Sequence, residues 1–128
     1  MKKEILKFHY EEIVYVLMIL GTNLNEYPEE ELKSFAEAIH RLDTLSKRDF
    51  LKELKVINPN IDTNVISNIV DLQNTISELY SGQWYKKLAN KSDVVNKSYD
   101  LSRQLLKDLN EEYIEPIKYA NGNMDVSW

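Results

Sequence analysis

Two histidines are the only side chains of this chain with an unperturbed pKa near neutrality, so acid–base or metal chemistry would begin with them. Glu37 and His40 have the Glu-x-x-His spacing that places two metal ligands on one helical turn in di-iron bundles. Such a site needs a second copy of this pair, and His9 precedes Glu12 in the reverse order. We therefore expect His40 to be a surface histidine beside an ion pair, with no metal site.

Other catalytic patterns are also missing from the sequence. The chain has no cysteine, no Gly-x-Ser-x-Gly elbow and no glycine-rich phosphate loop. Adjacent carboxylates such as Glu111 and Glu112 project about 100° apart on a helix, so they form no preset acid–base pair. The sequence therefore predicts a protein that is not an enzyme and needs no cofactor.

The composition and the first residues of the chain indicate its expected location in the cell. Of the 128 residues, 43% are hydrophobic and 29% are charged, which is typical of a soluble globular protein. The strongest apolar run, residues 13–20, is far shorter than the roughly 20 residues that a membrane-spanning helix needs. Lysines and glutamates are mixed near the N-terminus, unlike the order of a signal peptide. We expect a cytoplasmic protein with no membrane partner.

The elements that would position functional residues are predicted to be helices. With only 3 Gly and 3 Pro, the chain offers few places for the turns of a β-fold. Apolar residues recur at steps of three and four in four long stretches, which is the pattern of amphipathic helices. These stretches cover about residues 3–20, 28–42, 62–79 and 95–113. Gly21 ends or bends the first helix, and Pro28 suits the first position of the second.

Shorter elements and helix ends complete the predicted fold. Ser46 resembles an N-cap of a short helix that Asn58-Pro59 stops, and Asp62 can cap the third long helix, with Gly82 at its end. A further short piece covers 84–89, and Pro116 should end or kink the last helix. We predict an all-α, compact, antiparallel helical bundle of about four long helices plus one or two short ones. It would form one domain over residues 1–120, with an irregular tail over 121–128.

Charge is distributed unevenly around the net value of -5. Residues 26–31 and residues 108–128 each carry a charge of -4. The acidic side chains concerned are Glu26, Glu29, Glu30, Glu31, Asp108, Glu111, Glu112 and Glu115. Such blocks can steer a basic partner, and antiparallel packing could bring them together. Alternatively, the first block satisfies a helix dipole and the second only solubilises a surface.

The basic residues give no comparable signal. Between residues 86 and 107 they are Lys86, Lys87, Lys91, Lys97, Arg103 and Lys107. They are scattered around one predicted helix with Asp93 and Asp100 among them, whereas a nucleic-acid binder needs a continuous basic stripe. We interpret them as a solvated face and do not expect nucleic-acid binding.

Aromatic residues gather at a predicted loop. Tyr80, Trp84 and Tyr85 flank Ser81-Gly82-Gln83, and large amphipathic rings in such a position can anchor a protein partner. The same rings can instead cap the core of the bundle. Trp128 leaves the same two possibilities open.

These observations predict a non-catalytic protein that binds a basic protein partner. The most concrete form is an acidic inhibitor, such as an immunity protein or antitoxin, that occludes the cleft of a nuclease-like toxin. The acidic blocks would steer the partner, and Trp84 and Tyr85 would anchor it. A self-associating scaffold subunit is the first alternative, and a metal-dependent bundle enzyme using Glu37 and His40 is the second.

Overall fold

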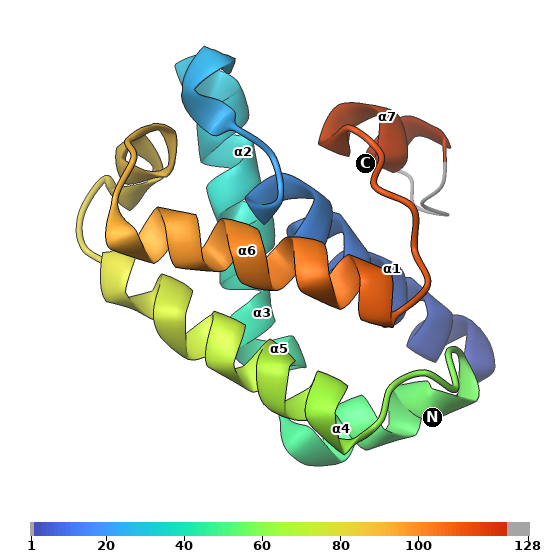
Figure 1. Ribbon diagram of the computed structural model, residues 1–128. Helices are drawn as coiled ribbons and strands as arrows, with labels where there is room; N and C mark the ends of the chain where they lie inside the picture. The colour runs from blue at the N-terminus through green and yellow to red at the C-terminus, as the bar shows by residue number, and fades with distance from the viewer. Residues whose placement is uncertain (1, 123–128) are drawn as a thin grey trace.

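The computed structural model describes residues 2–122, and every regular element within them is a helix (Figure 1). The long helices are α1 (Lys3–Leu20), α2 (Glu29–His40), α5 (Thr63–Ile76) and α6 (Asp93–Asp108). The short α-helices are α3 (Leu42–Leu45), α4 (Arg48–Glu53) and α7 (Pro116–Gly122). Four 3₁₀ segments are η1 (Leu24–Glu26), η2 (Leu54–Val56), η3 (Ser77–Leu79) and η4 (Trp84–Ala89). The predicted all-α helical bundle is confirmed.

Helix α1 is the centre of the bundle. Almost every side chain from Ile13 to Leu20 is buried, whichever way it points from the helix axis. A helix that is apolar all round needs neighbours on every side, and α2, α6 and α7 all pack against α1. The strongest apolar run of the sequence therefore forms the core, and it fixes where the surrounding helices lie.

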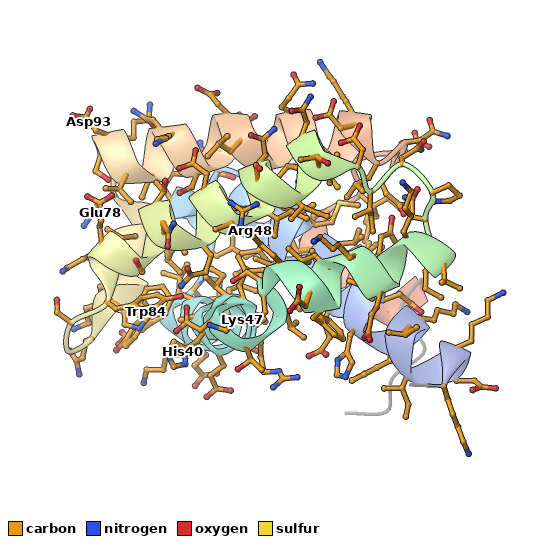
Figure 2. The ribbon with its side chains drawn as sticks, turned by 90° about the horizontal axis from the view of Figure 1, so that it is seen from below. His40, Lys47, Arg48, Glu78, Trp84 and Asp93 are labelled. Carbon is orange, nitrogen blue, oxygen red and sulfur yellow. The ribbon has the colours of Figure 1, made fainter. Side chains whose placement is uncertain are left out.

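Helices α1, α5 and α6 follow the expected antiparallel arrangement, but α2 does not. In Figure 1, α5 and α6 lie side by side and run in opposite directions, and α6 runs opposite to α1. Helix α2 crosses this set steeply, so that it is seen nearly end-on in Figure 2. The connection from α1 to α2 contains η1 and turns the chain away from the direction of α1. Among the described elements, α2 packs mainly against η4, α1 and α3, so one side of it has no long neighbouring helix.

The observed helix starts confirm some of the starts that were predicted from the sequence and contradict others. Asp62 is the N-cap of α5, and its Oδ1 accepts a hydrogen bond of 2.9 Å from the backbone N–H of Val65, as predicted. The predicted N-cap role of Ser46 is wrong, because Lys47 precedes α4 and gives no side-chain cap. Pro28 has an extended backbone and stands one position before the first residue of α2. The periodic stripe that predicted helix up to residue 79 runs through α5 and then η3.

The last long helix is shorter than predicted. It ends at Asp108 and not near Tyr113, because Asn110 takes a left-handed conformation with φ of 59°. The N–H groups of residues 110 and 111 donate to the carbonyls of residues 107 and 106, at 3.0 and 2.8 Å. This pair of bonds is the Schellman ending, and asparagine is one of the residues that adopt it. Residues 111–115, the connecting segment, therefore carry the chain across the bundle without helix.

Pro116 begins α7, whereas the sequence predicts that it ends or kinks a helix. Its fixed φ and missing N–H suit a first helical position as well as they oppose an interior one. The predicted irregular tail, 121–128, lies outside the described residues except for Asn121 and Gly122. These two residues complete α7.

Two buried hydroxyl groups on α6 should destabilise the protein, so their removal is expected to increase its stability. Ser98 and Ser102 are 1% and 0% exposed, and within residues 2–122 neither Oγ has a hydrogen-bond partner. Because a buried polar group without a partner costs free energy, replacing each serine with alanine should raise the free energy of unfolding by roughly 1 kcal/mol. Urea denaturation measures this change.

The control for these substitutions is Ser92→Ala. Ser92 is the N-cap residue of α6, and its hydroxyl accepts a hydrogen bond of 3.2 Å from the backbone N–H of Val95. Its loss should lower stability by about 1 kcal/mol. A loss of stability on replacing Ser98 or Ser102 would show that these hydroxyls are satisfied in solution.

Candidate functional site

The predicted acidic residues come from two parts of the chain, residues 26–31 and residues 108–115. Glu26 belongs to η1, and Glu29, Glu30 and Glu31 form the first turn of α2. Asp108 closes α6, and the other predicted acidic residues lie in the connecting segment 111–115. Asp108 lies beside the start of α5, in a polar depression that includes Asp62.

Three of the predicted binding carboxylates accept hydrogen bonds from tyrosines of the same chain. Tyr10 Oη donates to Glu111, Tyr27 Oη donates to Glu115 at 2.6 Å, and Tyr85 Oη donates to Glu29 at 2.7 Å. Each pair joins parts of the chain that are more than 50 residues apart. These three carboxylates therefore connect distant parts of the chain and stabilise the fold.

Tyr10 is the centre of a polar network at the base of the connecting segment. Asn58 Nδ2 donates to Tyr10 Oη at 2.8 Å and to the carbonyl of Leu109 at 2.9 Å. Burial raises the pKa of Tyr10, and its hydrogen bond to Glu111 adds to the increase. The network fastens the loop before α5 and the end of α6 to α1.

The middle of the connecting segment is fastened by Arg103. Its guanidinium carbon lies 3.7 Å from the ring centroid of Tyr113, and its Nε donates to the carbonyl of Gly21 at 2.6 Å. The hydroxyls of Tyr113 and Thr22 are also hydrogen bonded, at 2.5 Å. The segment therefore follows the end of α1 closely and delivers the chain to the start of α7.

Glu115 joins the start of α2 to the start of α7. It accepts the hydrogen bond from Tyr27 and two more, each of 3.2 Å, from the backbone N–H groups of Ile117 and Lys118. Burial alone would raise the pKa of Glu115, but these hydrogen bonds outweigh burial and lower the pKa below its ordinary value. Burial raises the pKa of Tyr15 and Tyr27, and the negative charges of Glu31 and Glu115 add to this increase. Glu31 of the first acidic block and Glu115 of the second therefore influence the same two tyrosine hydroxyls.

Acid should weaken this junction. Because the folded-state pKa of Glu115 is lowered, its stabilising contribution is complete above the ordinary value of 4.5 and is lost as pH falls through the lower folded-state value. Tyr27→Phe removes one cause of the lowering. The variant should therefore be less stable than the parent at about pH 6, and the difference should shrink at about pH 3. Urea unfolding of both proteins at each pH tests this, and a difference that is constant with pH would contradict it.

Trp84 and Tyr85 pack within the protein. The Trp84 ring is partly buried and its centroid lies 4.7 Å from that of Tyr80, whose ring contacts His40 at 5.1 Å. Lys33 Nζ lies 5.5 Å from the centre of the Tyr85 ring. The 3₁₀ segment η4 packs along α2, and Figure 2 shows Trp84 at one end of the bundle. Their role as partner anchors stays a prediction.

A groove between α1, α2 and α7 collects acidic side chains that sequence reasoning did not group. It has a volume of about 500 Å³ and is lined by residues of these three helices. Tyr15, Ala38, Ile117 and Ala120 form its apolar lining. Its carboxylates are Glu12 from α1 and Glu31 and Glu37 from α2. Only Glu31 belongs to the predicted acidic blocks, and only the placement of α7 reveals the groove.

Charge within the groove is only partly compensated. Glu12 pairs with Arg41, whose Nε lies 3.1 Å from Oε2, and with His9, whose Nδ1 lies 2.7 Å from Oε1. Among residues 2–122, neither Glu31 nor Glu37 forms an ion pair. The charge of Glu12 is therefore compensated, whereas Glu31 and Glu37, in the first and last turns of α2, carry uncompensated negative charge.

The pair Glu37 and His40 does not develop into a larger ligand set. Glu37 lines the groove, whereas His40 Nε2 lies 3.2 Å from Asp43 Oδ2. In the part of the chain that the structure describes, no group of three or more His, Cys, Asp or Glu side chains is placed to hold a metal ion. The same residues include no helix with the length and apolarity to cross a bilayer.

Comparison with protein-family models gives no match for this chain, and comparisons with curated proteins and with solved structures give no significant match. The functional assignment therefore depends on the geometry and chemistry of the groove and the surrounding surface.

Proposed function

We propose that the protein binds a basic protein at the groove between α1, α2 and α7, without catalysis and without a cofactor. The observation that carries this proposal is the composition of the groove, whose lining combines carboxylates from two helices with apolar side chains. Its concrete form is an acidic inhibitor, such as an immunity protein or antitoxin, that occludes a basic, nuclease-like toxin. The cleft of a nuclease is positively charged because it binds phosphates, so an acidic surface complements it.

The uncompensated carboxylates of α2 support a basic partner in particular. Glu37 is exposed and Glu31 is partly exposed, and neither has an ion-pair partner among the described residues. Carboxylates at the rim of an interface accelerate encounter with a positive surface and fix its orientation. An apolar lining then supplies surface that gains free energy when the partner covers it.

The binding surface must extend beyond the groove. A stable interface buries about 800 Å² on each partner, which is more than a groove of this size provides. Exposed residues of the predicted acidic blocks would supply the remainder: Glu26 in η1, Glu30 in the first turn of α2, and Glu112 in the connecting segment. Glu29, Glu111 and Glu115 contribute to this surface mainly by holding its parts in place through their tyrosine partners.

Salt dependence of association tests the proposal. The partner can be captured from an extract of the source cells on the immobilised protein, eluted with salt and purified. Its association rate constant should fall at least about tenfold between about 0.02 and 0.5 M salt, since exposed charges are screened over a few ångströms at the higher concentration. A rate constant that hardly changes with salt, or a partner without a basic surface, would contradict the proposal.

A further inference from the structure

We infer that the groove between α1, α2 and α7 receives one amphipathic α-helix of the partner, with basic residues along the side of that helix that faces α2. This inference rests on the proposed function and adds the form of the partner's binding element. It follows from the shape of the groove, from the secondary structure around it and from the positions of its charges.

The groove has the walls and the small side chains that a helix needs. Helices α2 and α7 both pack against α1 (Figure 1), and residues of all three helices line the groove. Ser34 and Ala38 on α2 and Ala120 on α7 line its walls. Packed helix axes are about 8–10 Å apart, and small side chains permit the closer distances. A helix lying on Tyr15 and Ile117 would cover the side of α2 that has no long neighbouring helix.

Other binding elements do not suit this groove. An extended peptide commonly binds by adding to a sheet edge, and residues 2–122 contain no strand. A proline-rich peptide needs a groove lined by several aromatic rings, whereas Tyr15 is the one aromatic residue of the lining. The remaining common mode is an amphipathic helix whose apolar side enters a groove formed by helices.

The charges define where basic residues of the partner should lie. Glu31 and Glu37 are six residues apart on α2, which corresponds to about 9 Å along the helix axis. On a helix lying along α2, cations six or seven residues apart have about the same separation. Arg41 closes the far end of the groove in its pair with Glu12. Cations of the partner should therefore lie opposite Glu31 and Glu37, and the part of the partner that faces the pair of Arg41 and Glu12 should be apolar or acidic.

The test uses a synthetic 18-residue helix of leucine and lysine as the probe, with leucines at helical spacing. Its binding to the full chain is followed by fluorescence anisotropy at low salt. Ala38→Phe fills the groove without changing charge, and Thr44→Phe is the matched control on an exposed position outside the groove. We expect Ala38→Phe to weaken binding at least about tenfold and Thr44→Phe to change it less than about twofold. Thermal unfolding of each variant confirms that it remains folded.

A second probe tests the helical form. It has the same composition with two central prolines, and it should bind at least about tenfold more weakly than the first, because proline breaks the helix. Equal binding of both probes, or full binding to Ala38→Phe, would overturn the helix-in-groove inference. So would failure of the helical probe to bind while the whole basic partner still binds in a salt-dependent way. That last outcome leaves the proposed function standing, whereas loss of salt dependence for the whole partner removes the function itself.

Discussion

Replacing Tyr10 with phenylalanine is expected to lower the free energy of unfolding by about 2 kcal/mol, with the fold retained. The hydroxyl of this buried residue donates to Glu111 and accepts from Asn58, so its removal leaves an amide hydrogen and a carboxylate without their partner. The cost of orphaning such groups is about 1–3 kcal/mol, and it is larger for a charged group. Because the network holds the end of α6 against α1, the variant should also loosen the connecting segment 111–115.

Tyr99→Phe is the control for this experiment. Tyr99 is 37% exposed, its hydroxyl forms no hydrogen bond within residues 2–122, and its ring faces Arg103 at 5.3 Å. Losing this hydroxyl should change stability by less than about 0.5 kcal/mol. Equal effects of the two substitutions in urea denaturation would show that the Tyr10 network is replaced by water in solution.

Reversing the two uncompensated charges of the groove is expected to have the largest effect on binding. The double variant Glu31→Lys and Glu37→Lys keeps the groove in place but turns attraction of a basic partner into repulsion. We expect its affinity for the partner to fall at least about a hundredfold, mostly through slower association. Stopped-flow kinetics with the purified partner measure both rate constants.

The matched control for charge reversal is Glu53→Lys with Glu78→Lys. These glutamates are exposed on α4 and η3, outside the groove lining, and their reversal changes the net charge by the same amount. This control should weaken binding less than about fivefold, since only the overall charge changes. Equal losses in the two double variants would mean that overall charge attracts the partner and that the groove has no special role.

The predictable part of the fold is the part determined by local pattern. The apolar stripes of α1 and α5 and the N-cap Asp62 are visible in sequence because residues three and four apart share a helix face. The end of α6 was not predictable in this way. Leu109 continues the repeat of buried apolar residues. The left-handed conformation of Asn110 ends the helix although this repeat is not interrupted.

The partners of the carboxylates in and around the candidate site could not be predicted from the sequence. Glu111 and Glu115 look like free surface charges because their tyrosine partners are 101 and 88 residues away in the chain. Glu37 looks like a partner for Arg41 one turn later, yet Arg41 pairs with Glu12 across to α1. Pairings of this kind depend on how α1, α2 and α7 meet. The excess of acidic residues was visible in the composition, but their division into structural and uncompensated carboxylates was not.

Hydrogen exchange of the full chain, with and without the purified basic partner, tests binding at the groove most directly. Exchange reports protection of backbone amides in each helix separately, so it locates the surface that the partner covers. We expect the partner to slow exchange in α2 and α7 and to leave the solvent-facing side of α5 and α6 unchanged. Protection confined to α5 and α6, with α2 and α7 exchanging as in the free protein, would contradict binding at the groove.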